Sequence, residues 1–227
     1  MDVCYCLGNG SLYNNAEIFH SLRLLEKHCK FDRVFIIGEK PEQAPIDYLY
    51  IPFKEKLGRT SNVFMKLVTM CDTDISEDFL YMMDDVFIIK NILLETYPLY
   101  HSGTIREYRM LTPYLGEVLE TKRFLERHNK PTLHFGVHCP IVYNKKKILE
   151  IDSFYWKYVN SREKKYGLNP RILYGNWFDG DKRYIEDLKI TKDFTLDALR
   201  TKIKDKEWFS IGSKSFDGNT RKLIEEL

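Results

Sequence analysis

Two adjacent acids, Asp84 and Asp85, stand between two apolar runs, 79–83 and 86–89. At the end of a buried strand, such a pair places two carboxylates at the rim of a sheet. Their oxygens suit a hard divalent cation, and an ion of this kind commonly binds phosphate as well. The pattern therefore predicts a metal site at these two residues.

The same acids have a structural interpretation. Asp is common in tight turns because its side chain bonds its own backbone, so the pair could close a hairpin between two buried strands. A two-residue hairpin loop favours Asp-Gly or Asn-Gly, whereas Val86 follows here. The missing glycine favours the metal site.

Two histidines form a second group able to do chemistry. His134 and His138 have an even spacing, so both would point to one side of an extended strand and could share a site as base or metal ligand. His138 is the predicted general base, because neutral imidazole accepts a proton near pH 7. The alternative is structural, with one histidine buried and hydrogen-bonded and the other exposed.

A loop and a helix face supply candidates for binding a substrate. Leu7, Gly8 and Asn9 leave the first apolar run, and glycine lets the backbone approach a ligand closely. Asn62 and Lys66 lie four residues apart, on one face of a predicted helix, and could bind a hydroxyl and a phosphate. Asn62 could equally be a polar residue of the first helical turn.

An arginine and two tryptophans complete the candidates. Arg23 lies on a helix otherwise patterned for the core, and a guanidinium binds phosphate through its fixed fork of donors, although pairing with Glu17 or Glu26 is an equal alternative. Trp177 and Trp208 lie beside turn residues and could stack on sugars at the acceptor side. Core packing is the commoner use of tryptophan.

The first half of the chain predicts the elements that position these residues. Buried strands are expected at 3–7, 34–37, 48–51 and 79–83. One helix is expected with Asn14 or Asn15 as its N-cap, and another with Ser61 as its N-cap. Short, continuous apolar strands alternating with helices indicate a largely parallel sheet covered on both sides. Ligands of such sheets bind beyond the carboxyl ends of the strands, where the Gly8 loop and the acid pair lie.

The second half is less regular. We expect a helix at 117–128, a strand at 141–143 and a helix at 146–157. No repeat or linker divides the chain. The economical prediction is one domain over 1–227, in which 1–98 binds the donor and metal and 99–227 shapes the acceptor side.

Composition limits the class of protein. The 227 residues are 44% hydrophobic, which suits one globular domain, and no apolar run approaches the roughly 20 residues that cross a bilayer. The start of the chain has no basic region leading into an apolar one, and the five cysteines form no metal or disulfide pattern. We therefore expect a cytoplasmic protein. A net charge of +2 does not by itself indicate a nucleic-acid ligand.

Several blocks resemble a known family. The blocks are 15–17 with 21–26, 32–38 with Pro41, Asn62, 76–81 with 84–87, and 138–143 preceded by His134. In this order they resemble the Stealth-type capsular polysaccharide sugar-phosphate transferases and shorter glycosyltransferase-like proteins of bacteria and phages. The resemblance covers about the first ninety residues and a short block near 140. Met83 stands where the Stealth pattern has Asn, and the Stealth opening motif is absent.

The resemblance implies an α/β fold: a single-domain, Rossmann-like GT-A fold with a mostly parallel central sheet flanked by helices. It implies a glycosyltransferase in which Asp84 and Asp85 hold Mn²⁺ or Mg²⁺ against the diphosphate of a nucleotide sugar, a UDP-sugar first. Asp85 and His138 would be catalytic. The mild basic bias of the second half permits a polymeric acceptor such as a cell-surface glycan, a teichoic-acid-like polymer or modified DNA, and the sequence does not rank them. Alternatives are a sugar-1-phosphate transferase and a non-catalytic glycan- or nucleic-acid-binding module.

Overall fold

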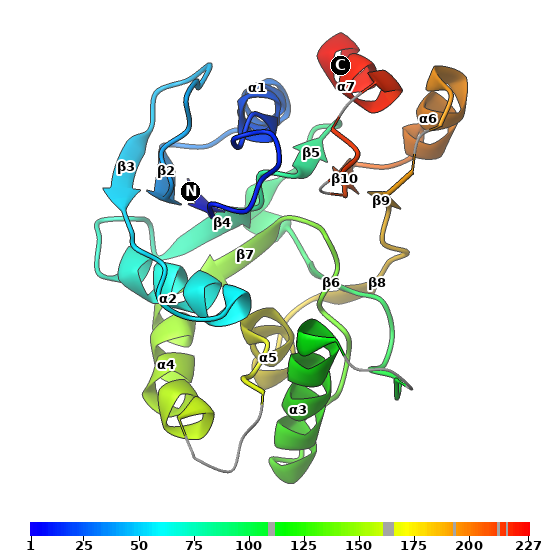
Figure 1. The fold of residues 1–227 in the computed structure, drawn as a ribbon. Helices are drawn as coiled ribbons and strands as arrows, with labels where there is room; N and C mark the ends of the chain where they lie inside the picture. Colours follow the sequence, from blue (N-terminus) through cyan, green and yellow to red (C-terminus); the bar gives the residue numbers. More distant parts are fainter. Residues whose placement is uncertain (109–111, 161–165, 193, 213, 217) are drawn as a thin grey trace.

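The computed structural model describes residues 1–108, 112–160, 166–192, 194–212, 214–216 and 218–227. Its centre is a five-stranded sheet in the order β3-β2-β1-β4-β7 (Figure 1). The strands are β1 (Asp2–Leu7), β2 (Val34–Gly38), β3 (Leu49–Pro52), β4 (Asp78–Met82) and β7 (Ile141–Asn144). The first four run parallel, and β7 pairs with β4 in the antiparallel sense. The expected mostly parallel sheet is confirmed, and β1, β2 and β4 are buried as predicted. Strand β3 lies at the edge of the sheet and is mostly exposed, so its prediction as a buried strand is wrong.

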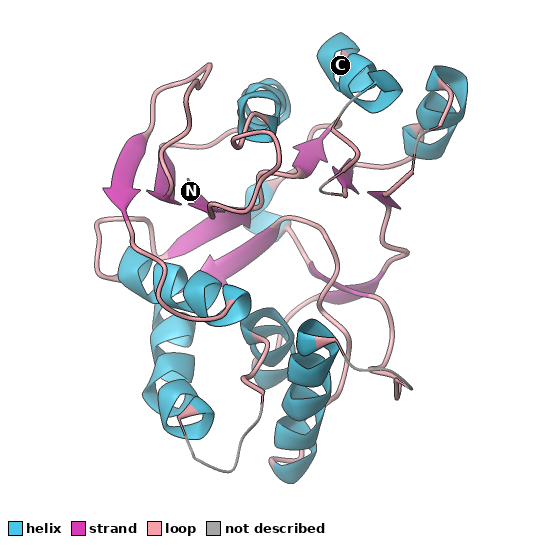
Figure 2. Cartoon of the chain, in the orientation of Figure 1, coloured by secondary structure: helices cyan, strands magenta, loops and turns pink. Residues whose placement is uncertain are grey.

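Helices cover both faces of this sheet (Figure 2). The helices in the described part of the chain are α1 (Glu17–His28), α2 (Arg59–Cys71), α3 (Pro113–Arg127), α4 (Lys145–Val159), α5 (Pro170–Trp177), α6 (Leu196–Ile203) and α7 (Gly218–Glu226), with a short 3-10 turn, η1 (Leu94–Thr96). The last two, α6 and α7, pack in a separate cluster with residues such as Phe87 and Phe209. Alternate residues of β1 point to opposite faces: Cys4 packs with α2 residues such as Phe64, whereas Val3 and Tyr5 pack with α1 residues such as Leu22. In the described part of the chain, no helix has the length and apolar composition needed to cross a membrane.

The predicted helix caps are wrong. The N-cap of α1 is Ala16 and that of α2 is Gly58, and neither provides a side-chain hydrogen bond. Asn14 and Asn15 instead have positive φ angles of 51° and 57°, a conformation that Asn tolerates better than most residues. The Asn15 side chain donates to the Gly8 carbonyl at 3.2 Å, so it stabilises the loop that follows β1.

Smaller sheets join the two halves of the chain. Strand β10 (Trp208–Ile211) pairs with β5 (Val86–Ile88) and with β9 (Lys189–Ile190), while β6 (Leu99–His101) pairs with β8 (Lys182–Tyr184). Strands β4 and β5 belong to different sheets, so Asp84 and Asp85 do not form the turn of a hairpin. Strands β7 and β10, from the second half of the chain, pair with β4 and β5 of the first half.

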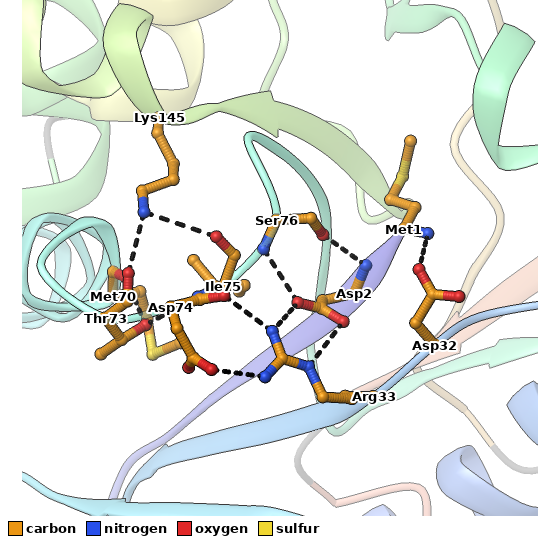
Figure 3. Close-up of polar contacts among 10 residues, drawn as sticks. All are labelled: Met1, Asp2, Asp32, Arg33, Met70, Thr73, Asp74, Ile75, Ser76 and Lys145. Atoms are coloured by element: carbon orange, nitrogen blue, oxygen red, sulfur yellow. Dashed lines mark hydrogen bonds and ion pairs between the residues drawn. The ribbon is translucent and has the colours of Figure 1, made fainter.

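The amino end of the sheet is closed by a polar network (Figure 3). Arg33 donates to both carboxylate oxygens of Asp2, at 3.2 and 2.8 Å, and to Asp74 at 2.6 Å. Asp2 is 2% exposed, and it also accepts from the backbone N–H of Ser76 at 2.8 Å. Burial raises the pKa of Asp2, but the hydrogen bonds from Arg33 and Ser76 and the Arg33 charge outweigh it, so the pKa is lowered.

Candidate active site

The acid pair forms a turn at the carboxyl end of β4. The backbone N–H of Val86 donates to the Met83 carbonyl at 3.2 Å, and the carbonyl of Asp85 accepts from Ile211 at 3.0 Å. The second bond attaches the turn to β10, so the position of Asp85 depends on the far end of the chain. Both acids remain partly exposed to solvent.

The turn suits a hard cation only in part. Among the described residues, no group of three or more His, Cys, Asp or Glu side chains could hold a metal ion. Two carboxylates supply some oxygen ligands, and substrate oxygens or water must supply the rest, as is usual for Mg²⁺. The Lys189 ammonium lies 3.6 Å from Asp85 Oδ2, which is too long for a charge-assisted hydrogen bond. The Asp85 carboxylate therefore remains available to a ligand.

His138 lies beside the acid turn and has an acidic partner. The β4–β7 ladder ends at the Tyr81–Ile141 pair, and the segment 187–189 then contacts both groups, through Asp187 to His138 and through Lys189 to Asp85. His138 Nδ1 is 2.8 Å from Oδ2 of Asp187, and the backbone N–H of His138 donates to the same carboxylate, at 3.2 Å to each oxygen. Burial raises the pKa of Asp187. The hydrogen bonds from His138 and the charges of His138 and Arg171 lower it by more than burial raises it, so the pKa lies below its usual value.

His134 has a different environment. The segment 134–138 is irregular rather than a strand, so the prediction of one shared strand face is wrong. His134 Nδ1 is 3.2 Å from the hydroxyl of Ser102, and burial is the main reason that its pKa is lowered. Its ring lies against Gly136, where an added Cβ would be 2.8 Å from the ring and 2.3 Å from the Tyr114 hydroxyl. Gly136 thus lets His134 and Tyr114 meet next to His138.

Lys66 supports the loop after β1 from inside the protein. Its side chain is 1% exposed, and its ammonium donates to the Leu7 carbonyl and to Glu55 Oε1, the latter at 2.6 Å. Gly38, at the end of β2, has a φ of 115°, and a Cβ there would lie 2.9 Å from the ammonium. Lys66 therefore positions Leu7, Gly8 and the exposed Asn9 without being open to a ligand itself.

Asn62 also serves the backbone. Its side chain accepts from the N–H groups of Lys56 and Leu57, at 3.2 and 3.0 Å, and donates to the Leu57 carbonyl at 2.6 Å. It is 3% exposed. These bonds use the polar atoms of its amide to hold the loop between β3 and α2, so we do not carry Asn62 forward as a donor-binding residue.

Three further candidates lie elsewhere in the fold. Arg23 donates to the carbonyl of Ile224 at 2.6 Å, which satisfies the end of α7. Trp208 is 5% exposed and packs on Tyr100 with ring centroids 4.8 Å apart, so it has no open face for a sugar. Trp177 ends α5 and packs on Phe154 at 4.8 Å, among the helices. None of the three is carried into the proposed site.

Three residues reach the site without a sequence signal that selected them. Asp187 and Lys189, two residues apart before and in β9, contact His138 and Asp85 respectively. Arg171, in the first turn of α5, donates to the Cys139 carbonyl and approaches Met83 Sδ at 3.7 Å. The only local clue was an arginine next to Asn169-Pro170, at the start of an apolar helix.

Comparison with known proteins supports the fold. No family model matches the sequence, and no curated protein matches it. The chain is similar to the galactosyltransferase LgtC, solved with donor and acceptor sugar analogs, at 13% identity over 100% of this chain and 96% of that one, with a TM-score of 0.54. A structure of an LgtC active-site mutant gives 11% identity, 93% and 87% coverage and a TM-score of 0.50. At this identity the likeness concerns the fold alone: a mixed α/β fold of the GT-A glycosyltransferase type.

Proposed function

We propose that this chain transfers a sugar from a nucleotide donor, a UDP-sugar first, to a hydroxyl group of a polymeric acceptor. The observation that supports it most is the pairing of two kinds of chemistry at one end of the sheet. The Asp84–Asp85 turn offers oxygen ligands, and His138, on the neighbouring segment, is bonded to Asp187 at 2.8 Å. The GT-A type of fold agrees with this arrangement.

His138 acts as the general base in this proposal. The Asp187 carboxylate accepts a hydrogen bond from Nδ1–H, which leaves Nε2 unprotonated and able to take the proton of an acceptor hydroxyl. The backbone bond from His138 to the same carboxylate fixes the orientation of the pair. Asp187 is a positioning residue, since it acts through the imidazole.

Asp84 and Asp85 would hold Mn²⁺ or Mg²⁺. When bound, the ion would neutralise charge on the diphosphate leaving group. In this proposal the loop formed by Leu7, Gly8 and Asn9 borders the donor side. The buried Lys66 ammonium stabilises this loop by donating a hydrogen bond to the Leu7 carbonyl. His134 and Tyr114 border the acceptor side, where a cell-surface glycan, a teichoic-acid-like polymer or a modified DNA base would bind.

A second candidate function keeps the site and changes the bond that breaks. The resemblance of 134–143 to the Stealth proteins favours transfer of a sugar 1-phosphate, with attack at phosphorus. Sugar transfer releases a nucleoside diphosphate, whereas sugar-phosphate transfer releases a nucleoside monophosphate. The products therefore distinguish the two reactions.

The test is a panel of nucleotide sugars with and without Mn²⁺. We expect one donor to raise the melting temperature only when the metal is present, because a ligand that binds the folded state stabilises it. Chromatography of the nucleotide released with candidate acceptor polymers then identifies the bond broken. If no nucleotide sugar binds, or if Asp84→Ala and Asp85→Ala leave all binding intact, the catalytic proposal is wrong and a binding module remains.

A further inference from the structure

We propose that Arg171 binds a phosphate group of a substrate beside the acid turn. The inference rests on the proposed function and names a residue and a ligand chemistry within that site. The phosphate has two possible sources: the donor diphosphate, or a phosphate of the acceptor such as that of a polyol-phosphate polymer. The experiment below separates them.

The start of α5 gives Arg171 a fixed position. The Asn169 side chain accepts a hydrogen bond from the backbone N–H of Ile172 at 3.1 Å. The backbone N–H of Asn169 donates to the buried Thr121 hydroxyl at 2.7 Å. Pro170 begins the helix, a position that suits its fixed φ. These bonds fix the backbone of the first turn of α5, from which the Arg171 side chain extends.

The guanidinium of Arg171 contacts the segment that carries the acid pair and the segment that carries His138. It approaches Met83, the residue before the acid pair, and Cys139, the residue after His138. The Arg171 charge also lowers the pKa of Asp187. Arg171 therefore lies between the two groups to which we assign the chemistry.

The direct contacts of Arg171 are with neutral groups, although the Asp187 carboxylate is near enough to feel its charge. The hydrogen-bond acceptors of Arg171 are the Cys139 carbonyl, Cys139 Sγ at 3.4 Å and Met83 Sδ at 3.7 Å. Sulfur is a weak acceptor. The Nε of Arg171 is shielded from solvent and has no hydrogen-bond partner among the described residues. In the described part of the chain, no carboxylate forms an ion pair with it.

Arginine stays protonated in proteins, and a poorly solvated charge is costly unless it is paired. The residue as a whole remains partly exposed, so a ligand can reach it. Its planar fork matches phosphate oxygens, and a phosphate would supply both the missing negative charge and strong acceptors. A phosphate group is thus the ligand that best completes this environment.

The experiment compares Arg171→Met and Arg171→Lys with the wild-type chain. Calorimetry measures the affinity for inorganic pyrophosphate with Mn²⁺, which represents the donor, and for glycerol 3-phosphate, which represents the acceptor. Glycerol controls for binding without phosphate. Arg33→Met is the matched control, because it removes an arginine from the opposite end of the sheet.

We expect Arg171→Met to weaken one probe by about tenfold or more, the value of a lost charge-assisted bond, and Arg171→Lys to weaken it less. Loss for pyrophosphate assigns the donor, and loss for glycerol 3-phosphate assigns the acceptor. The melting temperature of unliganded Arg171→Met should equal or exceed that of wild type. If Arg171→Met does not fold, Arg171→Lys carries the test.

Unchanged affinity for both probes in the variants overturns the inference, as does failure of the wild-type chain to bind either probe. The proposed function can fail separately. If Arg171-dependent pyrophosphate binding is present but no nucleotide sugar is bound or consumed, the phosphate site stands and the transferase proposal does not. If a nucleotide sugar is consumed equally by wild type and both variants, the transferase proposal stands and the assignment of Arg171 to a phosphate site does not.

Discussion

Two arginines at opposite ends of the central sheet have contrasting partners. Arg33, at the amino end, bonds the carboxylates of Asp2 and Asp74 (Figure 3). Arg171, at the carboxyl end, has a carbonyl and two sulfur atoms as its hydrogen-bond partners among the described residues. The amino end satisfies its charges internally and stabilises the fold. At the carboxyl end no carboxylate forms an ion pair with Arg171 in the described part of the chain, which suits a surface that binds an anionic substrate.

The strongest way to break this contrast is to remove a carboxylate from the acid turn. We expect Asp85→Asn to lower turnover by about a thousandfold or more, because it weakens the site of the charge-neutralising cation. The melting temperature should change little, because the ion pair that Asp85 forms with Lys189 is 3.6 Å long and partly exposed, and such pairs contribute little to stability. A donor-consumption assay together with thermal denaturation checks both halves. A large loss of stability with turnover retained would make Asp85 structural.

The next largest effect concerns the imidazole. His138→Gln should lower turnover by about a hundredfold or more, within the range for loss of a general base. Asp187→Asn should have a smaller effect, about tenfold, because it alters only the orientation and hydrogen bonding of the base. Steady-state kinetics at saturating donor provides the measurement. Equal rates in His138→Gln and wild type would exclude His138 as the base.

At the amino end the effect should be on stability. Arg33→Met leaves the buried Asp2 carboxylate with only its Ser76 bonds, so we expect a loss of about 2 kcal/mol in the free energy of unfolding. Pyrophosphate affinity should not change. Urea denaturation and calorimetry on the same sample compare the two quantities. Weakened pyrophosphate binding in this variant would show that the two ends are not independent.

The smallest effect is on acid stability. The folded pKa of Asp2 is lowered, so its contribution to stability is fully present above the unfolded value of about 3.9 and is lost as pH falls through the folded value. The melting temperature of wild type should therefore fall below about pH 4. Asp2→Asn should show a shallower fall over that window. A parallel decline in both proteins would assign the acid sensitivity to other carboxylates.

The parts of the fold that depend on local pattern were predictable. Strands β1, β2 and β4 are continuous apolar runs, and a run of that kind is stable only when both faces of a sheet are covered. The acid pair was found because two carboxylates after such a run stand out from the core around them. The helix caps were not predictable, because loop geometry around Asn14, Asn15 and Gly58 decides which residue starts each helix.

Residues distant in sequence were the main omission. Trp208 is a residue type that can stack on a sugar, but the pairing of β10 with β5 buries it. Arg23 could bind phosphate, but its guanidinium donates to the Ile224 carbonyl at the end of α7. Asp187, Lys189 and Arg171 had no spacing that linked them to the acid turn. Only the packing of α5 and the path between β8 and β9 bring them there.

By itself, the chain's order of residues determined the strands, the parallel core of the sheet and the position of the acids at its carboxyl end, because apolar periodicity acts over a few neighbouring residues. Tertiary structure decided which charges find partners, because pairing depends on segments from about 30 to about 100 residues apart in the sequence meeting within a few ångströms. Arg33 and Arg171 look alike in the sequence. Their surroundings in the folded protein make the first a structural residue and the second the phosphate ligand that we propose.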